Sequence, residues 1–384
     1  MQDSDKNEMM GKNKESVGEQ TRRGIRSLLI FLSLAGIVVF LPLGGAMIWR
    51  DRPLFYYLEF PPRLGGVVHA PFSLAVFVAL VLLILACLLP FIWRAVRTVR
   101  RGWEREKPEG ARFPGWGYAG AAVGLIAWIL AWTRFPWFSA FQAYTFPFLW
   151  VGYIIVVNAL DYKRTRSCLM LKRPIYFLAL FPASAVFWWF FEYLNRFVLN
   201  WHYVQIDMFG PWQYVLYASV CFSTVLPAVL STAELLGSFS FIKKAYKDFI
   251  PIRPARPQAL ALFVLILASA VLFFLALLPN LLFPFIWVAP LLSLVCLQRV
   301  FGRTHIFSPV SDGDWSRLVA LAAASLVCGF FWEMWNFYSM ARWEYSIPYV
   351  HRFLVFEMPL LGYAGYLPFG LECGAVGDLL KIER

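Results

Sequence analysis

Two short motifs place a carboxylic acid three residues before an asparagine in an apolar stretch: Glu192 with Asn195, and Glu333 with Asn336. Residues three apart share a helix face, so each motif presents a carboxyl and an amide to one space. Because lipid satisfies neither group, we expect the acids to face a cavity or a partner. Two facing glutamates would share a proton and could act as a general acid, a proton relay or a cation site. A structural role, in which each acid bonds the next loop or an arginine, is an equal alternative.

Further acids accompany the second motif. Glu357 comes at the entrance of the last apolar segment and Glu372 within it, where the first half has Ser231. We predict that any acid–base catalysis depends first on Glu333, then on Glu372 and Glu357, with Asn336 as the orienting residue. The second half thus has more acidic residues than the first. An active site in the second half would explain this difference, and random sequence divergence between two related halves would produce it as well.

Basic and aromatic side chains beside the motifs are candidate binding residues. Arg196 and Arg342 could take an anionic headgroup or neutralise the glutamates, and we favour neutralisation. Trp343 and Tyr345 follow the second motif, in an aromatic belt of the kind expected at a membrane interface. The predicted binding set is Glu192, Asn195, Arg196, Arg342, Trp343 and Tyr345.

The elements that position these residues must be membrane spans. Of the 384 residues, 60% are hydrophobic and only 15% are charged, outside the range of soluble globular proteins. A spanning helix needs about 20 mostly apolar residues, and about ten segments qualify. They are 26–49, 70–93, 115–133, 138–160, 175–196, 213–236, 259–279, 281–300, 317–340 and 358–379. The predicted fold class is an all-α integral membrane protein.

The distribution of basic residues predicts the orientation. Most of the 35 Lys and Arg residues fall in segments that a ten-helix chain with both termini in the cytoplasm would keep inside, as expected from the positive-inside rule. We expect a bacterial-type inner membrane protein. Its net charge of +12 is explained by loops facing the lipid bilayer, so nucleic acid is not a predicted partner. The histidine and cysteine spacings show no metal-site or haem pattern, and no cofactor is predicted.

The chain contains an internal repeat. Phe-Pro-Phe-Leu-Trp-Val at 146–151 recurs as Phe-Pro-Phe-Ile-Trp-Val at 283–288, and segment 190–203 is similar to 331–345. We predict a disordered cytoplasmic tail over 1–26 and a two-helix hairpin with a basic cytoplasmic loop over 27–112, followed by parallel four-helix repeats over 113–240 and 241–384. Parallel repeats would place both motifs at equal depth, at the outer ends of their helices.

One local pattern resembles a known group of enzymes. From Glu333 to Pro348 the chain has an acid at a helix end, a short loop, an aromatic-x-Tyr sequence and a proline. This order resembles that of integral-membrane carotenoid hydratases and cyclases, over a few tens of residues. The resemblance implies, by analogy, an acid that protonates a hydrophobic substrate.

These observations lead to one expectation and two alternatives. We expect a protein that acts on a hydrophobic or amphiphilic molecule, of lipid or isoprenoid type, near the outer leaflet; glutamate acid–base chemistry is the expected mechanism if it is an enzyme. A transporter or flippase built on two pseudo-symmetric repeats is the first alternative. A non-catalytic membrane scaffold is the second.

Overall fold

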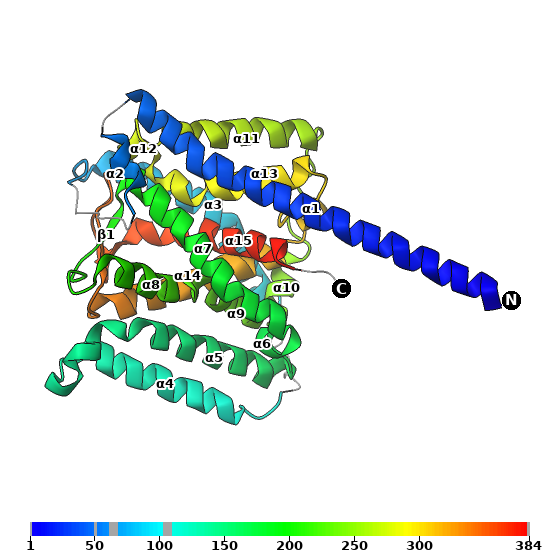
Figure 1. Ribbon diagram of the computed structural model, residues 1–384, viewed down its shortest axis with the longest axis horizontal. Helices are drawn as coiled ribbons and strands as arrows, with labels where there is room; N and C mark the ends of the chain where they lie inside the picture. Colours follow the sequence, from blue (N-terminus) through cyan, green and yellow to red (C-terminus); the bar gives the residue numbers. More distant parts are fainter. Residues whose placement is uncertain (1, 50–51, 61–67, 103–109, 382–384) are drawn as a thin grey trace.

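A computed structural model describes residues 2–49, 52–60, 68–102 and 110–381, with the backbone alone for residues 2–23. Most of this chain is helical (Figure 1). Within these described residues, seven helices are long and apolar enough to cross a membrane, or up to nine if each of two bent pairs forms one span. The protein is therefore an all-α, multi-pass membrane protein.

Most elements are α-helices, joined by short 3-10 helices and a few strands. The α-helices are α1 (Gln2–Trp49), α2 (Leu54–Leu58), α3 (Leu74–Arg100), α4 (Gly115–Trp132), α5 (Phe146–Thr165), α6 (Leu169–Lys172), α7 (Pro174–Val198), α8 (Pro211–Phe222), α9 (Val225–Gly237), α10 (Ser240–Tyr246), α11 (Pro257–Phe274), α12 (Pro279–Leu282), α13 (Ala289–Val300), α14 (Ser316–Phe337) and α15 (Tyr366–Leu379). The 3-10 helices are η1 (Pro136–Tyr144), η2 (Phe283–Trp287), η3 (Ser308–Asp312) and η4 (Leu360–Gly365), and the strands are β1 (Trp201–Tyr203), β2 (Trp343–Tyr345), β3 (Leu354–Val355) and β4 (Met358–Pro359).

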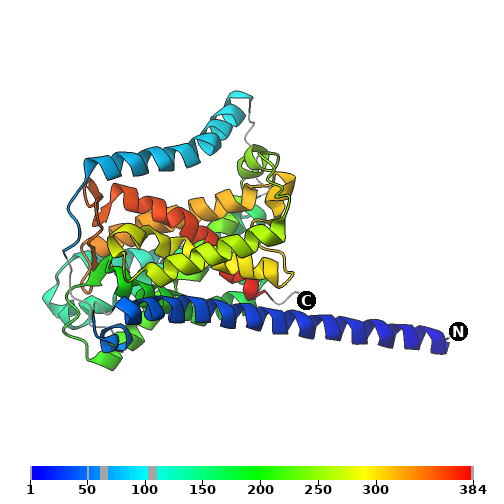
Figure 2. The same cartoon turned by 90° about the horizontal axis from the view of Figure 1, so that it is seen from above.

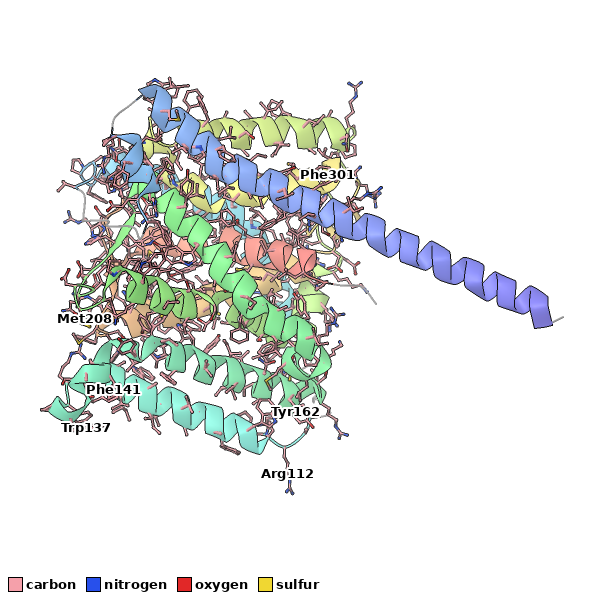
Figure 3. The ribbon with its side chains drawn as sticks, viewed as in Figure 1. Arg112, Trp137, Phe141, Tyr162, Met208 and Phe301 are labelled. Atoms are coloured by element: carbon pink, nitrogen blue, oxygen red, sulfur yellow. The ribbon has the colours of Figure 1, made fainter. Side chains whose placement is uncertain are left out.

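The helices run between two ends of the molecule. Trp137, Phe141 and Met208 lie at the end that carries β1, named here the strand end (Figure 3). Arg112 and Phe301 lie at the opposite end (Figure 3). Helix α1 begins and helix α15 finishes at that opposite end (Figure 1).

Helix α1 is longer than the sequence predicts. It starts at Gln2, whereas we expected a disordered tail over 1–26. Lys, Glu, Gln and Arg in this segment are good helix formers, and a helix that is already nucleated by its apolar part extends into them at little cost. Residue 1 and part of the predicted basic loop, 103–109, lie outside the described residues.

Helix α14 lies in the interior and packs against α9 and α15. Fully buried Trp150, Phe191 and Phe369 belong to the core beside it. Helices α4 and α5 pack closely because a Cβ on Gly152 would lie 2.7 Å from the Cα of Gly124, so only the absence of side chains allows this approach. Helix α3 stands apart from the bundle over most of its length (Figure 2).

Three predicted spans are interrupted. The η1 and α5 pair bends by 68°, and segment Pro279–Trp287 bends by 51° against α13. Pro147 and Pro290 come directly after the two breaks, in the first turns of α5 and α13, and proline lacks the N–H that a continuous helix requires. The segment 358–379, predicted as one helix, instead contains β4, η4 and the 14-residue α15. Glycine-rich 360–365 is a poor continuous α-helix.

The strands were not predicted. β1 and β2 pair in antiparallel fashion, with Trp201 opposite Tyr345 and Tyr203 opposite Trp343. Each strand follows one of the two Glu-x-x-Asn helices, α7 and α14. The pairing therefore joins the two motif regions directly at the strand end.

Candidate functional site

Glu333 lies on α14 and is fully buried. Its Oε1 accepts hydrogen bonds from the hydroxyl groups of Tyr345, at 2.8 Å, and Tyr366, at 2.6 Å. Trp343 Nε1 donates to the Tyr345 hydroxyl at 2.9 Å. The second carboxyl oxygen, Oε2, has no partner among the described residues.

Glu192 on α7 has the same kind of surroundings. Its Oε1 accepts from Trp188 Nε1 at 3.0 Å, Trp201 Nε1 at 3.1 Å and the Tyr203 hydroxyl at 2.7 Å. In the described part of the chain its Oε2 is also unpartnered. Each motif glutamate is thus held by one oxygen against aromatic donors. The two carboxyls share none of these donors, so the hypothesis of a shared proton gains no support from them.

The two sites differ in one donor. Trp188 comes four residues before Glu192, and the position four before Glu333 is Gly329. A Cβ on Gly329 would lie 2.4 Å from the Tyr366 ring. The missing side chain thus makes room for Tyr366, whose hydroxyl donates to Glu333 in place of an indole N–H. The residue that corresponds to Tyr366 in the first half is Val225, which has no donor.

The motif asparagines hold the strands rather than the acids. Asn336 Nδ2 donates to the Trp343 carbonyl at 2.7 Å, and its Oδ1 accepts from the Trp343 N–H at 2.9 Å. Asn195 Nδ2 donates to the Trp201 carbonyl at 2.8 Å, and its Oδ1 accepts from the N–H of Asn200 at 2.8 Å. The glutamate and asparagine of one motif therefore bind the same strand segment, one by its side chains and the other by its backbone.

The two arginines do not neutralise the motif glutamates by direct pairing. Arg342 forms an ion pair with Glu344 at 2.7 Å. Arg196 is buried and donates to the backbone carbonyl of Tyr57 at 2.7 Å. These contacts take the place of the expected Arg–Glu neutralisation.

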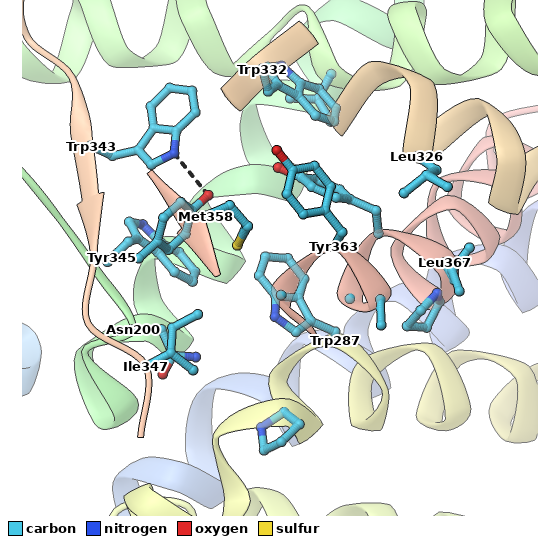
Figure 4. Close-up of a pocket in the computed structure, with 18 of the residues that line it drawn as sticks. Asn200, Trp287, Leu326, Trp332, Trp343, Tyr345, Ile347, Met358, Tyr363 and Leu367 are labelled. Carbon is cyan, nitrogen blue, oxygen red and sulfur yellow. Dashed lines mark hydrogen bonds between the residues drawn. The ribbon is translucent and has the colours of Figure 1, made fainter. Parts of the chain in front are cut away.

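A large cavity lies in front of the aromatic donors. Its volume is about 980 Å³, at the upper end of the range for ligand pockets. The lining includes the six donor residues Trp188, Trp201, Tyr203, Trp343, Tyr345 and Tyr366. Figure 4 shows Trp287, Trp332, Tyr345 and Tyr363 around this space. Glu192 and Glu333 do not line the cavity themselves, because their aromatic donors lie between them and this space.

The other predicted acids lie elsewhere. Glu372 on α15 is 3% exposed, its Oε2 has no partner in the described chain, and it borders a separate cavity of about 40 Å³. Glu357 lies in the turn between β3 and β4, where burial and the nearby charge of Glu344 raise its pKa while Arg342 opposes the shift. The structure therefore does not bring either acid into hydrogen-bond contact with Glu333.

Trp188, Trp201, Tyr203 and Tyr366 donate to the two glutamates but were missed as site residues. The repeat alignment already matched Tyr203 with Tyr345, and this was a usable signal for the first of the two tyrosines. Nothing local marks Tyr366, because its role depends on contact between α14 and α15. Among the described residues, no group of three His, Cys, Asp or Glu could hold a metal ion.

Comparison with known proteins adds no relative: no protein-family model, curated protein or solved structure matches the chain.

Proposed function

We propose that the protein binds a hydrophobic or amphiphilic molecule of lipid or isoprenoid type in the aromatic cavity, and that Glu333 exchanges a proton with it through Tyr345 or Tyr366. The observation that carries this proposal is that both tyrosines line the cavity and donate to a fully buried carboxyl. A mostly apolar pocket with a few convergent polar groups is the usual form of a small-molecule site.

The hydrogen bonds define a route for one proton. In the observed arrangement, a tyrosine hydroxyl donates to the Glu333 carboxylate and turns its oxygen lone pairs toward other groups. A ligand proton would pass to the tyrosine oxygen while the tyrosine proton passes to Glu333, which makes Glu333 the base. The reverse transfer, from protonated Glu333 through the hydroxyl to the ligand, makes it the acid.

The paired sites favour a second candidate, a transporter or flippase. Trp150 of the first Phe-Pro-Phe repeat packs on Trp332 of the second motif at 4.8 Å between ring centroids, and Trp287 of the second repeat packs on Phe191 of the first motif at 5.0 Å. Such reciprocal contacts are those of a two-fold interface. They support two pseudo-symmetric repeats, with Glu192 and Glu333 beside one cavity. In this proposal the cavity opens near the outer leaflet of an inner membrane.

The test is a lipid and isoprenoid profile of cells that lack the protein and are complemented with wild type, Glu333→Gln or Glu192→Gln at equal levels. We expect a lipid species to change in the deletion strain and to be restored by wild type but not by Glu333→Gln. Restoration by both variants contradicts proton transfer through Glu333. An unchanged total pool with altered sidedness, sensitive to both variants, identifies the transporter.

A further inference from the structure

Helix α3 is fastened to the bundle at its two ends. At the strand end, the Ser73 N–H donates to the Tyr349 carbonyl at 2.9 Å. At the opposite end, Arg94 Nε donates to the Ala245 carbonyl at 2.8 Å and Nη2 to the Asp248 carbonyl at 2.9 Å. Between these attachments α3 stands away from the other helices (Figure 2).

The aromatic cavity extends into this interval. On one side it is lined by Leu83 and Cys87 of α3, and on the other by Ala322 and Ala323 of α14. Its lining on the α14 side runs from Trp315 to Asn336, a helical distance of about 30 Å at 1.5 Å per residue. That length is about the thickness of the hydrocarbon core of a bilayer. The cavity is therefore a long slot rather than a compact pocket.

The polarity of the slot is uneven. No charged residue lines it within the described chain. Its polar groups gather at the strand end, where the tyrosines and tryptophans that bind the two glutamates lie beside Asn200 and Asn336. The part between α3 and α14 is lined by aliphatic and small side chains, with the aromatic rings of Phe91 and Trp315 toward the opposite end. A charged headgroup in this slot would be desolvated without a counter-charge.

We propose that the occupant is a single uncharged, elongated lipid, which enters sideways from the bilayer between α3 and α14. Its one weakly polar end lies at Tyr345 and Tyr366, and its apolar chain lies along Ala322, Ala323 and Cys87. This inference rests on the proposed function and names its substrate class. It excludes phospholipids and phosphorylated isoprenoids as the occupant.

The test uses two photoreactive probes that differ only in charge: a diazirine-bearing long-chain alcohol and its phosphate monoester. Each is added to the purified full-length protein, and the labelled peptides are mapped by mass spectrometry. We expect the alcohol to label peptides of α3 and α14, and the ester to label them at least roughly tenfold less, since an unpaired charge in hydrocarbon costs several kcal/mol.

Slot-filling variants supply the control. Ala323→Trp should reduce labelling by the alcohol roughly tenfold, and Ala122→Trp, on the exposed face of α4, should leave it unchanged. Leu83→Trp fills the slot from the α3 side if Ala323→Trp does not fold. Equal or stronger labelling by the ester, or labelling that neither slot variant reduces, overturns the proposal.

The measurement separates this inference from the proposed function. Labelling is measured on purified wild-type protein without turnover, so it reports binding and not proton transfer. Normal labelling together with full complementation by Glu333→Gln would reject proton transfer and keep the uncharged lipid. Preferential labelling by the ester, together with loss of complementation by Glu333→Gln, would reject the uncharged lipid and keep proton transfer through Glu333.

Discussion

The ring of Tyr366 lies against Gly329, where a Cβ would come within 2.4 Å of it. This contact between α14 and α15 brings the Tyr366 hydroxyl to 2.6 Å from Glu333 Oε1. In the first half, Trp188 occupies the position that corresponds to Gly329, and its indole N–H donates to Glu192 on the same helix. The two halves thus reach similar carboxyl environments by different donors, and only the Glu333 site draws a donor from the last helix.

Gly329→Ala should therefore displace Tyr366. We expect loss of the hydrogen bond to Glu333 and a destabilisation of about 1–3 kcal/mol from overpacking, measured as thermal unfolding of the purified protein in detergent. Tyr366→Phe is the matched control, because it removes the hydroxyl alone and should cost about 1 kcal/mol. Wild-type unfolding of Gly329→Ala would show that the ring can move aside freely.

Asn336→Ala should loosen strand β2. It removes the two hydrogen bonds that Asn336 makes with the backbone of Trp343, and we expect a loss of about 1–3 kcal/mol in thermal stability. Asn195→Ala should behave similarly at β1. If Asn336→Ala unfolds like wild type yet abolishes complementation, the amide orients the acid, as first predicted, and does not hold the strand.

Glu372→Leu should leave stability unchanged or raise it. The acid is buried beside apolar side chains and its Oε2 lacks a partner in the described chain, so replacement by an apolar residue of similar size removes a desolvation penalty of about 1–3 kcal/mol. Thermal unfolding measures this directly. A marked fall in stability would mean that Glu372 has a stabilising partner, such as a water in the small cavity.

The orientation of the chain can be tested with single cysteines at exposed positions. Asp207→Cys lies beyond β1 at the strand end, and Lys247→Cys follows α10 at the opposite end. In spheroplasts, a membrane-impermeant maleimide should label Asp207→Cys, but label Lys247→Cys only after permeabilisation. The unsubstituted protein controls for Cys87, which is exposed. The reverse pattern would place both termini outside.

The sequence was sufficient for the fold class, because long apolar segments have few stable alternatives to helices in a membrane. It also placed Glu333 and Asn336 on one helix. It did not reveal that their partners differ, since the asparagine binds the backbone of Trp343 and the glutamate binds side chains. Those assignments depend on a short strand whose pairing partner is far along the chain.

The other features that the sequence did not predict also depend on tertiary contacts. Tyr366 became a site residue through helix contact at Gly329, a tertiary relation that no local pattern records. The large cavity depends on α3 standing away from α14, and hydrophobicity alone cannot distinguish a helix packed on the bundle from one held only at its ends. The number of spans likewise depends on how the two bent pairs cross the membrane.

The β1 and β2 pairing constrains how the two halves can move. Backbone hydrogen bonds continue beyond it, from the Val204 N–H to the Arg342 carbonyl and from the Ser346 N–H to the Asn200 carbonyl, both at 2.8 Å. Separating α7 from α14 at this end would break the hydrogen bonds of the paired strands and the two flanking ones together. If the protein is the proposed transporter, a rocking motion of the halves would therefore pivot on these paired strands and have its greatest amplitude at the far ends of α7 and α14. The strand end would then be the hinge and not the gate.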